Sequence, residues 1–452
     1  MSQELAEQLA SYADELEYAD LDADTVQTVK ERVIDSLACA YAGVDHEPVQ
    51  NVLGYTTEKT GEPTASLLCE DRTASVEHAT LANGTLIRYL DWNDTYLSAE
   101  PAHPSDNLGA ILSVADAYDN TGKETIRAIA LGYEIQCRLC DAASLRTNGF
   151  DHVNYGSVSV PLAVGTLMEL SIRELTHAVN IAVNSHVALR QARSGELSPW
   201  KGIAFANVAR NGVVAAELAR NGIEGPAPIF EGTFGFFNQV SGEFSLDPAS
   251  FGGNEGIFKI NQTHVKFYPV EYHAQAAVNC ALSLRDEHDI DWQSIERIEN
   301  ETYEAAVSII AGEDEKWQPD TRETADHSMP YCIARAFIDG ELTIEQFSDE
   351  KIHDTNVRQL METIEVTEKE EFTDEYGTSF PHRMIVHTNN DTYEDSIEYP
   401  KGHYENPLTD EEREEKFTAA TEDHLSRDRR DELLEWIRTL NEQNEISPLF
   451  PC

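Results

Sequence analysis

The stretch THVKFYPVEYHAQAAVNCALSLRDE, residues 263–287, separates two different sequence patterns. It combines a short β-like segment, a turn at Pro269 and a helix. Before it, one helical pattern follows another; after it, residues 294–310, 363–372 and 383–400 alternate as strands do, with a hairpin turn at 389–391. The helical pattern returns after KGHYENPLTDEEREEKF, residues 401–417. We therefore predict a mainly α protein in which a smaller α+β domain interrupts a large, discontinuous, all-helical domain.

Residues 24–43, DTVQTVKERVIDSLACAYAG, illustrate the helical pattern. Asp24 is a typical helix-capping residue, Val26, Val29 and Val33 share one face, and Gly43 suits the end of the helix. Similar patterns predict helices over 76–92, 105–122, 123–145, 156–170, 173–190 and 203–222. The predicted domains are 1–265 for the first helical part, 266–400 for an α+β lid domain and 401–452 for the C-terminal helical part.

The charge of the chain restricts its partners. Its 452 residues include 82 acids and 33 lysines and arginines, for a formal net charge of −49. This charge repels nucleic acid and anionic membranes. The acids are scattered over the whole length, as in proteins of very salty cytoplasm, where dissolved ions screen their repulsion. The polar start SQELAEQLASYADEL and the absence of a long apolar run predict a soluble, cytoplasmic protein.

The seven cysteines do not form a disulfide-like framework. Cys137 and Cys140 form a C-x-x-C pair inside a helical pattern, but no second pair or histidine cluster follows. A structural zinc site needs four ligands and an iron–sulfur cluster needs more thiolates. We interpret both cysteines as packing residues, and predict no metal site.

Two lysines stand out because cations are scarce in this chain. Lys201 lies in SPWKGIAF and Lys266 in THVKFYPVEYHAQ, each among apolar and aromatic neighbours. Either lysine alone could lie along an apolar surface with its ammonium in water. Together they suggest a cationic pocket inside an anionic protein, which suits a small polycarboxylate substrate.

Residues 91–107, DWNDTYLSAEPAHPSDN, join two predicted helices. Asp91 ends the first helix, Thr95 lies one turn later, and His103 precedes Ser105, the expected N-cap of the second. A helix N-terminus attracts carboxylates, and a histidine there can transfer protons near neutral pH. The alternative interpretation is a capped interhelical loop with solvated acids.

The same segment resembles the D-[FY]-x-D-T … H-P-S segment of the MmgE/PrpD family. SPWKGIAFANVARNG, VKFYPVEYHAQAAV, RETADHSMPY and YPKGHYENPLTDEEREEKF resemble further signatures in the family's order, so the resemblance covers nearly the whole chain. It implies the same two-domain architecture, a homodimer, and catalysis without a cofactor. It also implies a residue set: catalytic Asp91, His103, Lys201 and Lys266, with Thr95 and a further pocket histidine, His152 in GFDHVNYG, binding substrate. The helix start at Ser105 is expected to bind a substrate carboxylate as well.

The resemblance implies the removal of water from 2-methylcitrate, a small tricarboxylate, to give 2-methyl-cis-aconitate in propionate breakdown. Such a reaction needs a base, an acid for the departing hydroxyl, and cations that stabilise the aci-carboxylate. Lys201 and Lys266 suit the last role, whereas Asp91 and His103 form an acid–base pair whose order stays open. A cis-aconitate decarboxylase or an iminodisuccinate epimerase would use the same scaffold. An inactive helical dimer with a binding or structural role is the alternative outside enzymes.

Overall fold

The structure, a computed structural model, describes residues 4–195 and 197–450. The chain divides into two compact units. Unit 1 contains the described residues of the ranges 1–195, 199–263 and 410–452, and unit 2 contains residues 264–409 with 197 and 198. The predicted fold class, mainly α with a smaller α+β part, is confirmed. The domain boundaries drawn from the sequence stay a prediction.

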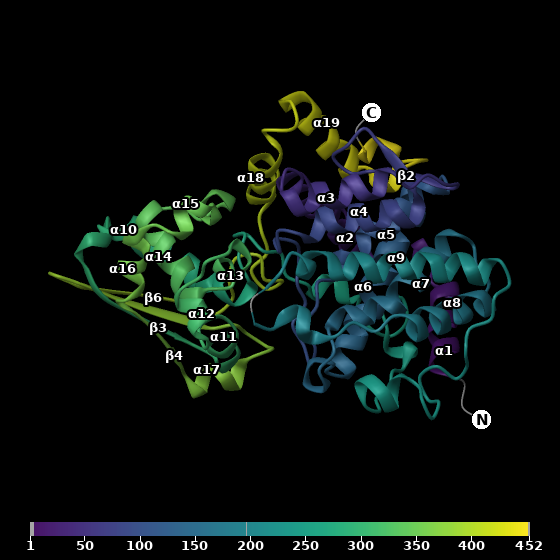
Figure 1. The fold of residues 1–452 in the computed structure, drawn as a ribbon, viewed down its shortest axis with the longest axis horizontal. Helices are drawn as coiled ribbons and strands as arrows, with labels where there is room; N and C mark the ends of the chain where they lie inside the picture. Colours follow the sequence, from purple (N-terminus) through teal and green to yellow (C-terminus); the bar gives the residue numbers. More distant parts are fainter. Residues whose placement is uncertain (1–3, 196, 451–452) are drawn as a thin grey trace. The chain divides into compact units, whose positions relative to one another are not determined.

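Unit 1 is built almost entirely of helices (Figure 1). Its helices are α1 (Leu5–Glu15), α2 (Ala23–Gly43), α3 (Glu47–Thr57), α4 (Val76–Arg88), α5 (Leu108–Ala117), α6 (Gly122–Ala142), α7 (Gly156–Leu167), α8 (Ile172–Ser185), α9 (Trp200–Arg220), α18 (Asp410–Thr421) and α19 (Arg427–Arg438). A small antiparallel pair, β1 (Thr64–Ser66) and β2 (Thr73–Ser75), departs from the all-helical expectation. All twelve residues of α7 are buried, so this helix forms the centre of the unit.

Side-chain caps define several helix starts in unit 1. The cap of α2 is Asp22, which accepts a hydrogen bond from the backbone N–H of Thr25, so the predicted cap at Asp24 is wrong by two residues. A capping box of Thr121 and Glu124 begins α6. The helix expected to begin at Ser105 instead begins with a 3₁₀ turn, Pro104–Asn107, that leads into α5. Each of these differences is a shift in a boundary and leaves the helix in place.

The C-terminal helices complete unit 1 by packing on its first helices (Figure 1). Helix α18 contacts α2, and the buried Lys416 donates to Asp35 Oδ1 at 2.6 Å. The same ammonium donates to the backbone carbonyl of Trp92 at 3.1 Å, and lies 4.6 Å from the centre of its ring. Because Trp92 follows Asp91 directly, the last helices support the segment that the sequence marks as a site.

Unit 2 contains a four-stranded sheet of order β4-β3-β5-β6 (Figure 1). The strands are β3 (Ile295–Thr302), β4 (Ile364–Glu368), β5 (His382–Thr388) and β6 (Thr392–Ile397); β3 and β4 are parallel, and the other pairs are antiparallel. The helices are α10 (Gln275–His288), α11 (Glu304–Ile310), α12 (Asp314–Trp317), α13 (Arg322–Ala325), α14 (Met329–Asp339), α15 (Asp349–Ile352), α16 (Thr355–Met361) and α17 (Glu370–Glu375). Helices α10 and α14 pack on the sheet. The strand expected over 294–310 ends at Thr302, because the apolar residues that follow recur at helical spacing in α11.

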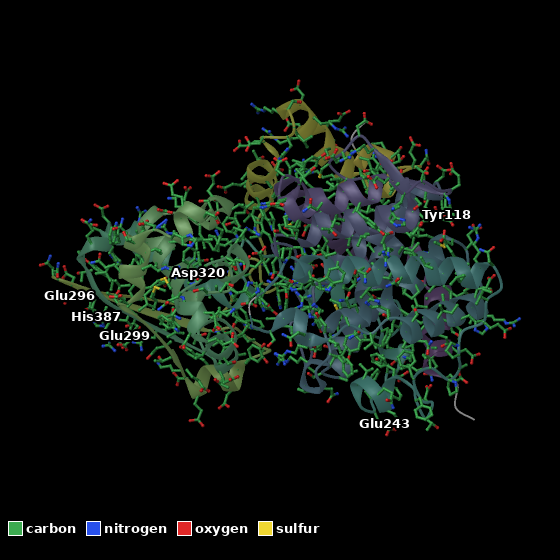
Figure 2. All side chains as sticks on the ribbon, in the orientation of Figure 1. Tyr118, Glu243, Glu296, Glu299, Asp320 and His387 are labelled. Atoms are coloured by element: carbon green, nitrogen blue, oxygen red, sulfur yellow. The ribbon has the colours of Figure 1, made fainter. Side chains whose placement is uncertain are left out.

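Carboxylates cover the surface of both units (Figure 2). Those on the sheet of unit 2 are often paired with cations: Arg297 lies 2.7 Å from Glu365, and Arg383 lies 2.7 Å from Glu394. Exposed pairs of this kind contribute little to stability, and the large excess of acids leaves most of the negative charge for the solvent to screen. Among the helices that the structure describes, none is long and apolar enough to cross a membrane.

Candidate active site

Three helices of unit 1 meet at small residues and thereby place the candidate site. A Cβ on Gly109 of α5 would lie 2.5 Å from the Cα of Gly84 in α4. A Cβ on Gly84 would in turn lie 2.8 Å from the Cβ of Ala206 in α9. Such separations are shorter than van der Waals contact, so only glycine allows these helix backbones to come so close. The end of α4, the approach to α5 and the start of α9 are thus brought to one place.

Asp91 lies in a tight turn directly after α4. Its φ of +54° is in the left-handed region, which aspartate and asparagine tolerate better than most residues. Its Oδ1 lies 2.6 Å from Arg88 Nη1, and its Oδ2 lies 2.7 Å from Lys201 Nζ in the first turn of α9. The next residue, Gly202, allows this approach, because a Cβ there would lie 2.9 Å from the Cα of Tyr89. The result is a buried carboxylate between two buried cations.

The loop after Asp91 is held in shape by buried polar groups. Asp94 accepts hydrogen bonds from the backbone N–H of Ser105 at 2.9 Å and from the hydroxyl of Tyr133 at 2.7 Å. Burial raises the pKa of Asp94, while the nearby Arg32 and these donors oppose the shift. The amide of Asn93 donates to Ser105 Oγ at 2.8 Å. This network fixes the 3₁₀ turn relative to Asp91.

His103 faces the Asp91 carboxylate. Its Nδ1 lies 2.8 Å from the backbone carbonyl of Asp94. Because a carbonyl only accepts hydrogen bonds, Nδ1 carries the proton, and Nε2 is the basic nitrogen of the neutral ring. Nε2 lies 3.7 Å from Asp91 Oδ1, which is longer than a hydrogen bond but close enough to stabilise an imidazolium. The arrangement suits transfer of a proton at Nε2.

Asp106, which sequence reasoning missed, lies on the other side of Arg88. Its Oδ2 lies 3.6 Å from Arg88 Nε, and its Oδ1 accepts a hydrogen bond from the Asn93 amide at 2.8 Å. Burial raises the pKa of Asp106 to about 7, despite the lowering effect of Arg88. The signal in the sequence was present but unremarkable, since Asp106 has the appearance of an ordinary residue in the first turn of a helix.

A second carboxylate, Asp151, binds two further basic groups. Its Oδ1 lies 3.1 Å from His152 Nδ1, and its Oδ2 lies 3.1 Å from Arg193 Nε. Burial and the two nearby arginines, Arg193 and Arg88, lower the pKa of His152 to about 3, against the opposing effect of Asp151. Its ring is therefore neutral. The centres of the His152 and His103 rings are 5.8 Å apart, so this group adjoins the Asp91 cluster.

The sequence-predicted site residues fall into three sets. The structure brings together Asp91, His103, Lys201 and His152 in unit 1. Thr95 and Ser105 lie in the same loop, where the Thr95 hydroxyl donates to the carbonyl of Ala102 at 3.1 Å and the Ser105 hydroxyl accepts from Asn93. Lys266 is 1% exposed and belongs to unit 2. The roles assigned to all seven residues stay predictions.

Cys137 and Cys140 are both buried in α6, where burial raises the pKa of each thiol well above its usual value. Neutral, buried thiols of this kind are poor metal ligands and poor nucleophiles. Within residues 4–195 and 197–450, no group of three or more histidine, cysteine, aspartate or glutamate side chains is arranged to hold a metal ion.

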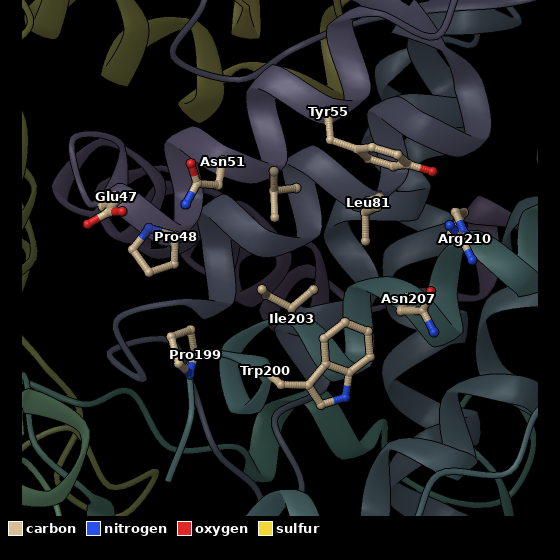
Figure 3. Close-up of a pocket in the computed structure, with 11 residues that line it drawn as sticks. Glu47, Pro48, Asn51, Tyr55, Leu81, Pro199, Trp200, Ile203, Asn207 and Arg210 are labelled. Atoms are coloured by element: carbon tan, nitrogen blue, oxygen red, sulfur yellow. The ribbon is translucent and has the colours of Figure 1, made fainter.

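A surface pocket of about 610 Å³ lies beside α9, where its walls come from α3, α4 and α9 (Figure 3). Trp200 projects into it together with Ile203 and Leu81, whereas the adjacent Lys201 contacts Asp91. None of the residues that line this pocket belongs to the Asp91 cluster. The pocket is therefore a separate feature from the candidate active site.

Comparison with known proteins places the chain in a family. The model of the MmgE/PrpD N-terminal domain matches residues 7–249, and the model of the MmgE/PrpD C-terminal domain matches residues 268–442. The mitochondrial 2-methylcitrate dehydratase of Yarrowia lipolytica is 28% identical over 405 residues, which are 84% of this chain and 76% of that protein. The 2-methylcitrate dehydratase of Escherichia coli K12 is 27% identical over 402 residues, 82% of this chain and 80% of that protein. An alkylcitrate dehydratase of a fungal species is 29% identical over 426 residues, 88% of this chain and 83% of that protein.

Proposed function

The chain belongs to the MmgE/PrpD family, and from this premise we propose that it is a hydro-lyase that removes water from 2-methylcitrate to give 2-methyl-cis-aconitate. The observation that carries the proposal is the cluster of Asp91, Lys201 and His103. It supplies a buried cation and a correctly oriented histidine at one place. Relatives named 2-methylcitrate dehydratase support the choice of substrate.

The geometry supports a division of roles between His103 and Asp91. His103 Nε2 removes the proton from the carbon next to a carboxylate, and the electron pair of that C–H bond passes into the aci-carboxylate. The C–O bond then breaks, the electron pair returns to form the C=C bond, and the imidazolium gives its proton to the departing hydroxyl as water. Asp91, 3.7 Å from Nε2, stabilises the imidazolium between these two steps.

Lys201 stabilises the charge that develops on the substrate. Its ammonium is 2.7 Å from Asp91 and the residue is 6% exposed, so it acts where water is largely excluded. We include Lys266 in the same role because the family motif carries it, and Thr95 and Ser105 as groups that contact or orient the carboxylates of the substrate. The proposal also includes the domain boundaries 1–265, 266–400 and 401–452 and a homodimeric assembly. It further includes a cytoplasmic location, a halophilic source of the protein and a role in propionate catabolism.

The test is to incubate the purified protein with 2-methylcitrate, citrate and cis-aconitate in molar KCl. Dehydration creates a conjugated double bond, which is followed by ultraviolet absorbance. Release of carbon dioxide from cis-aconitate without dehydration of 2-methylcitrate would favour a decarboxylase. Epimerisation of iminodisuccinate would favour an epimerase, and absence of turnover on all these acids would favour the binding or structural role.

A further inference from the structure

Asp151 contacts His152, which the family resemblance already assigns to the substrate pocket, and Arg193, which has no role in the proposed chemistry so far. Asp151 is 1% exposed. Its Oδ1 lies 3.1 Å from His152 Nδ1, and its Oδ2 lies 3.1 Å from Arg193 Nε. Its position is itself fixed, because its backbone N–H donates to the carbonyl of Ala188 at 3.1 Å. The two basic side chains therefore have set orientations, although Arg193 is 42 residues away in the sequence.

Each basic side chain has one buried atom left over. His152 Nε2 and Arg193 Nη2 are both buried, and neither has a hydrogen-bond partner among the described residues. The Asp151 carboxylate, 3.1 Å from Nδ1, favours the proton of the neutral ring on that nitrogen, so His152 Nε2 offers a lone pair, whereas Arg193 Nη2 offers N–H groups. An unsatisfied buried group costs about 1–3 kcal/mol, so two such groups on side chains that contact the same carboxylate are suited to a ligand that satisfies them.

The chemical class of that ligand follows from the two atoms. Nε2 needs a hydrogen-bond donor, and Nη2 needs an acceptor, ideally an anionic one. An α-hydroxycarboxylate provides both on adjacent carbons, with the hydroxyl hydrogen for the histidine and a carboxylate oxygen for the arginine. The ring of His152 lies edge-on to that of His103, with their centres 5.8 Å apart, so a hydroxyl bound at His152 would lie in the neighbourhood of the proposed proton carrier.

Resting on the proposed dehydratase function, we propose that Arg193 and His152, both oriented by Asp151, form a specificity subsite for the hydroxyl and adjacent carboxylate of the tricarboxylate substrate. Arg193 binds the carboxylate, and His152 accepts the hydroxyl hydrogen. During the elimination the substrate hydroxyl keeps its own hydrogen, which stays hydrogen-bonded to His152 Nε2. The hydroxyl oxygen receives a second hydrogen from His103 as the C–O bond breaks, and it leaves as water. Asp151 is the positioning residue of the subsite.

The first test compares ligands that carry an α-hydroxycarboxylate with one that lacks the hydroxyl. Citrate and malate both carry an α-hydroxycarboxylate, whereas tricarballylate has the three carboxylates without the hydroxyl. In Arg193→Met, calorimetric titration should show citrate and malate binding weakened by about 10- to 100-fold, the loss of a charged hydrogen bond. The matched control is Arg190→Met, since Arg190 lies on the same 3₁₀ turn, Arg190–Arg193, but is exposed. It should leave both affinities within about 2-fold of the parent, the range of a surface substitution.

The second test separates a binding role from a purely structural one. Arg193→Lys retains a cation for Asp151 but lacks the guanidinium fork, so full rescue of citrate binding would overturn the proposal. His152→Gln should reduce the preference for citrate over tricarballylate at least about 10-fold, because that preference depends on the hydroxyl. An unchanged preference, or equal losses in the Arg193 and Arg190 variants, would also overturn it.

These measurements distinguish the subsite from the proposed function. Turnover of 2-methylcitrate by a protein whose Arg193→Met variant binds citrate like the parent would refute the subsite alone. Binding effects as expected, in a protein that dehydrates none of these acids, would refute the dehydratase function and leave the subsite standing. For an active protein, Arg193→Met should raise KM for 2-methylcitrate by the same about 10- to 100-fold, with kcat within about 3-fold of the parent.

Discussion

Replacement of Asp91 by asparagine tests the centre of the candidate site. The substitution keeps the shape of the side chain and tolerates the φ of +54°, so the turn after α4 should be retained. It removes the negative charge that lies 2.6 Å from Arg88 and 2.7 Å from Lys201. At an effective dielectric constant of about 20, each contact corresponds to roughly 6 kcal/mol of Coulomb attraction before the cost of desolvation.

The net loss of stability should be smaller than this attraction. Breaking a buried ion pair by removing one partner typically costs about 3–5 kcal/mol, and we expect Asp91→Asn to lower the free energy of unfolding by that amount. Adding Lys201→Met removes one of the cations left behind, so the double variant should be about 1–3 kcal/mol more stable than Asp91→Asn alone. Neither variant should retain dehydratase turnover.

The assay is chemical denaturation in molar KCl, followed by tryptophan fluorescence, with kcat measured on the folded proteins. Glu224→Gln is the control, because Glu224 pairs with Arg173 at a site where both side chains are largely exposed. It should cost less than about 1 kcal/mol. If Asp91→Asn costs no more than this control, or if the double variant is less stable than the single one, the reasoning about the buried carboxylate is refuted.

Four further outcomes are expected. His103→Ala should lower kcat by about 10²- to 10⁴-fold with little change in KM, and near-parental kcat would remove His103 from the proton transfer. Because the pKa of Asp106 is raised to about 7 in the fold, the folded protein holds a proton that the unfolded chain releases near pH 4, so this group makes the parent less stable as pH rises to 7. Asp106→Asn should therefore gain stability relative to the parent as pH rises from about 4 to about 7 in denaturation experiments, and a constant difference would contradict the shift. Stability and activity should rise with KCl into the molar range, and equal values in dilute buffer would refute the halophilic interpretation. Protein treated with a chelator should keep full activity, whereas a loss that iron or zinc restores would reveal a metal requirement.

The sequence predicted the fold class well because helical periodicity is a local property. The helices of unit 1 and the strands β3 to β6 follow patterns that their own residues carry. Errors occurred at boundaries: the cap of α2 is Asp22, and the alternation after Thr302 belongs to α11. Local preference identifies an element more reliably than its first or last residue.

The candidate site was only partly predictable. Lys201 could be found because a lysine among apolar residues is conspicuous in an acidic chain. Arg88 was missed although it has the same character, three residues before Asp91 in an apolar run. Arg193 had no local signal, since its partner Asp151 is distant in the sequence and only the fold joins them. Conversely, Lys416 is as deeply buried as Lys201, yet its pairing with Asp35 serves to hold the fold together. Burial of a lysine alone therefore does not identify a functional site.

The contact between Lys416 and the carbonyl of Trp92 constrains how the protein is made. The two residues are 324 positions apart, and a ribosome adding about 5–20 residues per second needs roughly 16 to 65 seconds to synthesise the chain between them. During this interval the first helices have emerged without the partner that holds Trp92, the neighbour of Asp91. Unit 2 can fold meanwhile, because its residues 264–409 are synthesised as one stretch. The nascent chain can therefore complete the support of the candidate site only when α18 has left the ribosome.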